Sequence, residues 1–299
     1  MAGSQRVYKQ KIRATKTLEK VFRAMELIAS SRIGRARDRA LGQDPYTRAL
    51  ISSIATVAGS VSDLQHPLIT PRTDTSRVAI LVVTSDRGMA GAYSSSVLRE
   101  AEARIESLRE EGKEPLLYVY GRRGESYFKF RKVPMERVWT GSSDNPNPEV
   151  AQEIADEMLG RFLAAEDEGG VAELHVVFTR FVNMVQQTVQ VRRMLPLEVV
   201  DADGDEPIEE APLYEFEPSA EEVFDAILPM YVSQRIQAVL LMAAASELAA
   251  RQQAMHAATD NARELIEDYT RLANNARQAE ITTEITELIS GADALENAS

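Results

Sequence analysis

The stretch MHAATDNARELIEDYTRLANNARQA, residues 255–279, carries an apolar or small residue at every third or fourth position. These positions follow the repeat of a coiled coil, and they are Met255, Ala258, Ala262, Leu265, Tyr269, Leu272, Ala276 and Ala279. Near the other end of the chain the same spacing joins Ala14, Leu18, Val21, Met25 and Ile28. The two patterns predict an antiparallel coiled coil of the chain's two ends, which requires the middle of the chain to fold back as a compact insertion.

The sequence between these helices changes its period. Residues 77–84, RVAILVVT, form a continuous apolar and β-branched run, which is typical of a strand buried on both faces. Further strands are expected at 116–120, near Val138, at 173–181 and at 188–195, with helices between most of them. We therefore predict an α/β fold: an inserted, Rossmann-like α/β domain at 77–200 between an N-terminal coiled-coil helix at 1–65 and a C-terminal one at 213–299.

The long helices have identifiable interruptions and starts. Asp44-Pro45 either opens a new helix or kinks the first one. Leu213 to Glu217 alternates apolar and charged residues, which favours a short edge strand, after an acidic loop at 201–212. Ser219 with Glu222 forms a capping box for the C-terminal helix, in which Pro229 predicts a kink.

Composition excludes several classes of protein. Among the 299 residues there is no cysteine, so disulfides and thiolate metal sites are excluded, and the three histidines lie in separate segments. The longest apolar stretch, 236–250, contains Gln237, Ser246 and Glu247 and falls short of the roughly 20 residues of a membrane span. With no secretory signal legible either, we expect a cytosolic protein or one peripheral to a membrane.

Charge is strongly segregated along the chain. The net charge is -12, yet the first 40 residues hold eleven Lys and Arg against three acids. Such a basic helix could bind nucleic acid, an acidic protein surface or anionic lipid, could serve as a transit peptide, or could be a solvated face. The apolar stripe that continues through it argues against a transit peptide.

No catalytic or cofactor site is legible. Ser85-Asp86-Arg87-Gly88 follows the buried strand, where phosphates often bind, but it and Gly121-Arg122-Arg123-Gly124 lack the G-x-G-x-x-G fingerprint. No phosphate loop with its lysine occurs. We interpret both segments as tight strand-to-helix turns, and we expect no cofactor, no metal and no enzymatic activity from this chain alone.

Specific segments at both ends and in the middle resemble the γ subunit of F-type ATP synthase, in its bacterial, actinobacterial-like form. The matching segments are Lys11-Ile12-Arg13, residues 24–30 (AMELIAS), residues 84–88 (TSDRG) with Gly91, residues 257–262 (AATDNA), residues 276–280 (ARQAE) and residues 281–295 (ITTEITELISGADAL). Departures are few: residues 21–23 are VFR where I-T-K/R is usual, and Tyr93-Ser94 replaces F/Y-N. The cysteines of the thiol-regulated chloroplast form are absent.

The resemblance implies a central rotor shaft that couples c-ring rotation, driven by proton flow, to ATP synthesis in the α3β3 ring. It implies a non-catalytic subunit with catalysis on β, present once per complex, with ε and the c-ring as further partners, at the cytoplasmic face of the cell membrane. Rotor–stator contacts are expected at Met25, Arg251, Gln278, Thr282 and Glu284, and contacts with the c-ring or ε at Tyr214, Phe216 and Glu217. The alternatives are a coiled-coil scaffold whose basic helix binds nucleic acid and, more distantly, a dinucleotide-dependent enzyme.

Overall fold

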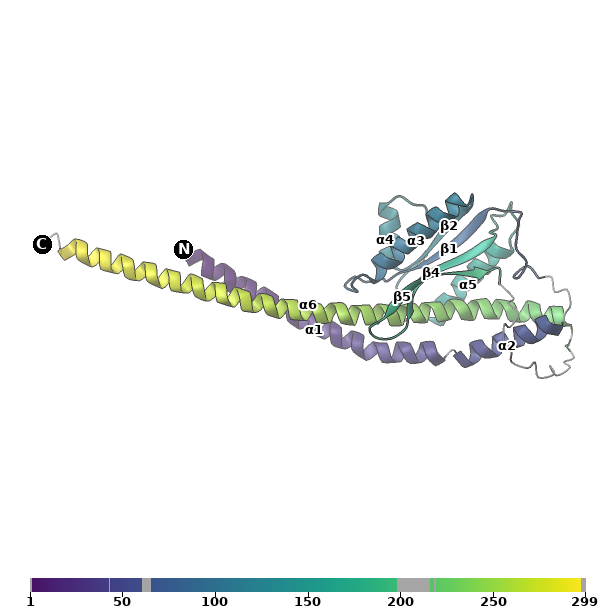
Figure 1. Ribbon diagram of the computed structural model, residues 1–299, viewed down its shortest axis with the longest axis horizontal. Helices are drawn as coiled ribbons and strands as arrows, with labels where there is room; N and C mark the ends of the chain where they lie inside the picture. Colours follow the sequence, from purple (N-terminus) through teal and green to yellow (C-terminus); the bar gives the residue numbers. More distant parts are fainter. Residues whose placement is uncertain (1, 43, 61–65, 198–215, 218, 297–299) are drawn as a thin grey trace, which may run out of the picture. The chain divides into compact units, whose positions relative to one another are not determined.

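The computed structural model describes residues 2–42, 44–60, 66–197, 216–217 and 219–296 (Figure 1). The chain forms two compact units. We call Met1–Ala29 with Arg251–Ser299 the terminal unit, and Ser30–Ala250 the central unit. The predicted acidic loop and most of the predicted edge strand, including Tyr214, lie outside the described residues.

Three helices account for the ends of the chain. Helix α1 spans Ala2–Gly42, α2 spans Asp44–Ser60 and α6 spans Ala220–Glu296, so a new helix does begin beside Pro45. The backbone amide of Glu222 donates to the hydroxyl of Ser219, as a capping box requires. Pro229 stands inside α6, which continues past it as one helix of 77 residues.

The central unit contains a five-stranded sheet of order β3-β2-β1-β4-β5. Its strands are β1 (Arg77–Val83), β2 (Glu114–Tyr120), β3 (Arg137–Trp139), β4 (Glu173–Phe181) and β5 (Gln187–Leu195). β1 is parallel to β2 and to β4, β2 is parallel to β3, and only the β4–β5 pair is antiparallel. The predicted α/β class is confirmed, and the sheet is parallel except at the β4–β5 pair.

Each face of the sheet has its own hydrophobic core. Val78, Ile80 and Val82 of β1 pack with α3 (Tyr93–Glu110) and with Phe128 of α4 (Arg122–Phe130). The alternate residues Leu81 and Val83 pack with α5 (Pro148–Leu163) and with the first turns of α6. Figure 1 shows α3 and α4 on the opposite side of the sheet from α5. β1 is therefore apolar at every position after Arg77, because both of its faces are covered.

In the terminal unit, α1 and α6 pair antiparallel, as predicted. Arg263 lies 3.1 Å from the carboxylate of Glu19, and His256 lies 2.9 Å from that of Glu26. The rings of Tyr8 and Tyr269 are 6.5 Å apart between centroids. In this register the first turn of α1 reaches α6 near residue 277, so the last turns of α6 extend past the end of their partner (Figure 1).

The predicted seam of α1 was wrong. Leu18, Val21 and Ile28 are about half exposed and Ala14 is exposed, and only Met25 of that set is partly buried. The buried or half-buried positions instead are Tyr8, Ile12, Thr15, Glu19, Phe22, Glu26 and Ala29. The predicted seam of α6 mostly holds, because its members Met255, Ala258, Ala262, Tyr269 and Ala276 are buried or half-buried. Leu265, Leu272 and Ala279 are exposed instead, and Ile266 and Ala273 turn inward. The predicted and the observed sets of residues on α1 both have helical spacing. The less apolar set faces α6, because it contains the carboxylates that pair with Arg263 and His256.

Candidate functional site

The rotation of α1 leaves an apolar stripe on its outer surface, which we call the outer stripe. It consists of Val7, Ala14, Leu18, Val21 and Ile28. Leu18, for example, is 50% exposed. Exposed apolar side chains along one face of a helix make that face a candidate site for binding another molecule.

A second exposed apolar surface lies at the end of α6, beyond the turns that α1 reaches. We call it the apolar tip, and it consists of Ile281, Ile285, Leu288 and Ile289. Leu288 is 74% exposed.

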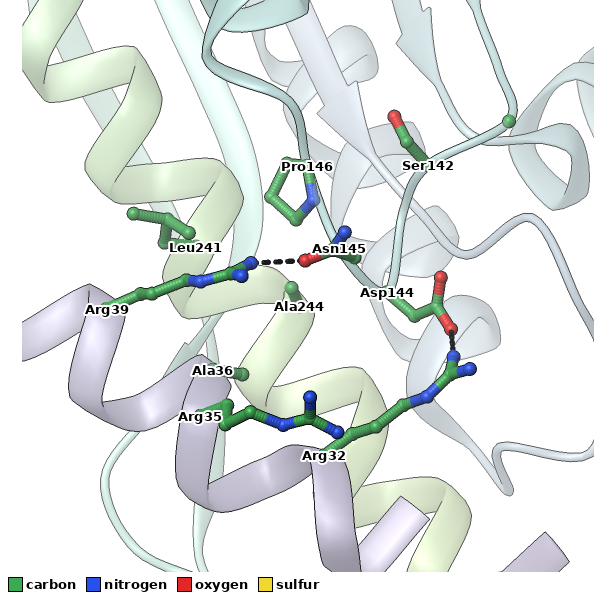
Figure 2. Close-up of a pocket in the computed structure, with 11 residues that line it drawn as sticks. Arg32, Arg35, Ala36, Arg39, Ser142, Asp144, Asn145, Pro146, Leu241 and Ala244 are labelled. Carbon is green, nitrogen blue, oxygen red and sulfur yellow. Dashed lines mark hydrogen bonds and ion pairs between the residues drawn. The ribbon is translucent and has the colours of Figure 1, made fainter. Parts of the chain in front are cut away.

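A basic pocket of about 410 Å³ lies in the central unit between α1, α6 and the loop 141–146. Arg32, Arg35 and Arg39 line one wall, and Leu241 and Ala244 of α6 line another (Figure 2). The spacing of three and four residues places the three guanidinium groups on one face of α1. Ala36, between them, is small enough to leave the pocket open.

Two of the three arginines reach across the pocket to the loop. Arg32 forms an ion pair of 2.6 Å with Asp144, and Arg39 donates a hydrogen bond to the side-chain oxygen of Asn145 (Figure 2). Arg35 has no ion pair or hydrogen bond with any residue that the structure describes. In Figure 2 its guanidinium extends along the wall toward the side chain of Arg32. The pocket therefore holds more positive than negative charge.

Asp86 holds the loop side of this pocket in place. Its carboxylate accepts hydrogen bonds of 2.9 Å from the backbone amides of Gly141 and Ser143 and one of 3.1 Å from the amide of Arg122. The hydroxyl of Ser143 accepts the backbone amide of Asp86 at 2.8 Å. Asp86 thus fills the anion position at the N-terminus of α4 with a carboxylate of the same chain.

The segment 121–124 is a tight turn, as we interpreted it, whereas 85–88 lies in a longer connection between β1 and α3, where a Cβ at Gly88 would meet no atom within 4 Å. A side chain at Gly121, whose φ is +102°, would place its Cβ 2.3 Å from the carbonyl oxygen of Thr84. At Gly124 the Cβ would lie 2.8 Å from the hydroxyl of Thr84, which accepts the backbone amide of Gly124. These glycines are required for close packing of α4 on β1.

The residues predicted to contact other subunits lie in different environments. On α6, Arg251 is 6% exposed, whereas Gln278, Thr282 and Glu284 are exposed more than seven turns further along the helix. The hydroxyl of Thr282 donates to the carbonyl of Gln278 at 2.9 Å. Arg251 is therefore separated from the other three, which share the exposed end of the helix.

The remaining predicted contacts are Met25, Phe216 and Glu217. Met25 is half-buried between the inner seam and the outer stripe of α1. Phe216 is half-buried and packs against the core beneath the sheet, and Glu217 is exposed. Of the edge strand predicted at 213–217, the structure describes Phe216 and Glu217, and neither lies in a strand.

Sequence reasoning missed the basic pocket as a site, although it noted its arginines. Their spacing of three and four residues on one helix was a usable signal. The opposite wall lies about a hundred residues away in the chain, and nothing local indicated that Asp86 would hold it there.

Among the described residues, no group of His, Asp and Glu could hold a metal ion. α6 contains one window with the length and composition of a membrane span, at a mean hydropathy of 1.3. Since 44% of that window is buried within the structure, it also fits a core helix.

Comparison with known proteins gives consistent matches. The family model described as ATP synthase matches residues 4–295. The ATP synthase gamma chain of Beutenbergia cavernae is 59% identical, and that of Arthrobacter sp. is 54% identical, each over 99% of both chains. Among solved structures, a chain of the Euglena gracilis mitochondrial ATP synthase, in an assembly of OSCP, F1 and c-ring, has a TM-score of 0.67. That match is 16% identical and covers 99% of this chain and 95% of the other.

Proposed function

The chain belongs to the ATP synthase gamma-chain family, and we propose from this premise that it is the central rotor shaft of an F1Fo ATP synthase. In this role it couples rotation of the c-ring, driven by proton flow, to ATP synthesis in the α3β3 ring. The chain itself is a non-catalytic subunit, and catalysis takes place on β. One copy per complex stands at the cytoplasmic face of the cell membrane.

The observation that carries this proposal is the double-faced α1 helix. Its inward-facing side is held to α6 by polar pairs, while the outer stripe presents apolar side chains that are about half exposed. A shaft that turns inside a sleeve needs a surface that makes no directional bonds, because ion pairs would hold one angle. Apolar contact is non-directional and meets this need.

The basic pocket supports a more specific contact with the stator. Arg35 is available to pair with a carboxylate, and the hydrogen bond of Arg39 to Asn145 leaves its positive charge unneutralised because the amide oxygen is neutral. Both guanidinium groups can pair with carboxylates on loops of the α or β subunits that reach the pocket as the shaft turns. The exposed end of α6, with Gln278, Thr282 and Glu284, supplies hydrogen-bonding groups for further stator contacts, and Met25 lies beside the outer stripe.

We assign the segment just before α6, which contains Phe216 and Glu217, to contacts with the ε subunit and the c-ring. The support is the exposure of Glu217 next to Phe216, which is tied to the sheet core. Glu217 is charged and is held in place by the packing of Phe216 next to it, so it can contact the polar loops of the c-ring. Tyr214 belongs to the same proposed contact from sequence alone.

Cysteine cross-linking in the reconstituted complex tests the assignment of ends, because the chain has no cysteine of its own. Leu18→Cys is expected to capture α or β, and Glu217→Cys to capture ε or subunit c. Glu106→Cys, on the exposed surface of α3, is the matched control for labelling without a defined neighbour. Capture of β from Glu217→Cys, or of subunit c from Leu18→Cys, would mean that the shaft is oriented the other way.

A further inference from the structure

A second basic cleft, distinct from the basic pocket, lies at the edge of the sheet in the central unit. It has a volume of about 710 Å³ and is lined by the last residues of β5, the first turns of α6 and the ends of α3 and β4. Its positive residues are Arg104, Lys113, Arg192, Arg193 and Arg235. Only Glu111 and Glu173 among its lining residues are acidic.

Both carboxylates that line this cleft already form ion pairs with its positive residues. Lys113 lies 2.9 Å from both Glu111 and Glu173, and Arg104 lies 3.0 Å from Glu111. Glu173 also lies 2.7 Å from the ring of His175. This half of the cleft is therefore balanced within itself and has no carboxylate left for the other half.

The other half consists of Arg192 on β5 and Arg235 on α6, with Tyr231 beside them. Arg192 stacks over the ring of Phe178, at 5.8 Å from its centroid, and Arg235 over that of Tyr231, at 5.9 Å. Neither guanidinium has an ion pair with any residue that the structure describes. Both side chains are half-buried, so water only partly screens their charges.

The two guanidinium groups also act on each other. Burial and the neighbouring charges of Arg235 and Arg180 lower the pKa of Arg192. Two like charges that share a partly desolvated site disfavour one another, and a bound anion removes this penalty. Arginine pairs held by aromatic stacking are also pre-oriented to bind an anion by two parallel hydrogen bonds.

We propose that this cleft binds a soluble anion that carries a phosphate group, held between Arg192 and Arg235 with the hydroxyl of Tyr231 as an additional donor. The volume admits more than one phosphate group, so a pyrophosphate-sized ligand is favoured over a single small ion. Such a ligand would join β5 to α6 across the open edge of the sheet. This site goes beyond the rotor function, which does not require it.

Calorimetric titration of the full chain with sodium pyrophosphate at low ionic strength tests the proposal. We expect one site, and Arg192→Gln or Arg235→Gln should each weaken the association constant about tenfold or more, because each removes a charge-assisted contact. Arg109→Gln is the matched control, since Arg109 is exposed on α3, is paired with Glu106 and does not line the cleft. Circular dichroism of each variant checks that the fold is retained.

Arg192→Lys provides a second control, because it keeps the charge but loses the two-pronged geometry, and we expect affinity between that of wild type and Arg192→Gln. Absence of pyrophosphate binding to the wild-type chain, or equal weakening by Arg109→Gln, would overturn the proposal. So would Arg192-dependent sedimentation with phosphatidic acid vesicles in the absence of pyrophosphate binding, since the ligand would then be a lipid headgroup.

Discussion

The central unit and the terminal unit use their apolar residues in opposite ways. In the central unit, every residue of β1 after Arg77 is buried, and two helical layers cover the sheet. In the terminal unit, the facing sides of α1 and α6 combine tyrosines, a histidine and carboxylates with apolar residues such as Phe22, while leucines and valines face outward. The first unit is built to be stable alone, and the second presents to other molecules the surface that a folded protein ordinarily hides.

The largest expected effect tests the stability of the central unit. Leu81→Ala removes a side chain that is 0% exposed and should lower the free energy of unfolding by about 2–5 kcal/mol. Urea titration followed by the fluorescence of Trp139, the single tryptophan and itself buried in this unit, measures the change. Leu18→Ala is the matched control and should shift stability by no more than about 0.5 kcal/mol. Equal losses in both variants would remove the contrast between the units.

A smaller effect is expected from pH, again in the central unit. Burial lowers the pKa of His175 despite the opposing effect of Glu173, so the folded state holds this ring neutral. As pH falls below about 6.5, the unfolded chain takes up this proton more readily, and stability is lost. The melting temperature should therefore be lower at pH 5 than at pH 7.5, and His175→Gln should reduce the difference. An unchanged difference in that variant would assign the pH dependence to other groups.

The polar contacts of the terminal unit should contribute less. Glu19→Gln breaks the ion pair with Arg263, which is half exposed, and should destabilise the paired helices by less than about 1 kcal/mol. Hydrogen exchange should become faster in α1 near residue 19 and stay unchanged in β1. High salt should reduce the difference between variant and wild type, because salt screens exposed ion pairs. Insensitivity to salt would show that packing, rather than charge, holds this contact.

The smallest effect on the isolated chain is expected from the outer stripe. Leu18→Ser with Val21→Ser should leave unfolding within about 0.5 kcal/mol of wild type, because both side chains are about half exposed. In the reconstituted complex the same variant should lower ATP-driven rotation or coupled synthesis, since the apolar contact surface of the shaft is interrupted. A variant that rotates normally would show that the outer stripe is not a bearing surface.

Sequence predicted the sheet better than it predicted the paired helices. The run of residues 77–84 has one interpretation, because a continuous β-branched segment between turn residues is rarely anything but a buried strand. In α1, by contrast, Leu18 and Phe22 lie on two stripes of the same helical period. Which stripe faces α6 depends on pairs such as Glu19 with Arg263, more than 240 residues apart. Local periodicity cannot contain that information.

The same reasoning applies to the candidate sites. The turn at Gly121 and Gly124 could be interpreted from the sequence, because the glycines and the missing fingerprint are both local features, whereas the interpretation of 85–88 as an equally tight turn was wrong. The basic pocket could not be assembled, since its arginines, its loop and Asp86 come from three distant segments. The contacts proposed with other subunits rest on the family resemblance and stay predictions.

Asp86 places a carboxylate at the edge of the sheet where the parallel strands end, which is the edge where Rossmann-like sheets bind nucleotides. Its carboxylate occupies three backbone amides that would otherwise point at a phosphate, so the site carries a permanent internal counter-ion. The cell holds abundant ATP and ADP, and a shaft that bound them here would respond to their concentration. With this anion supplied by its own chain, the N-terminus of α4 needs no bound phosphate as its counter-charge.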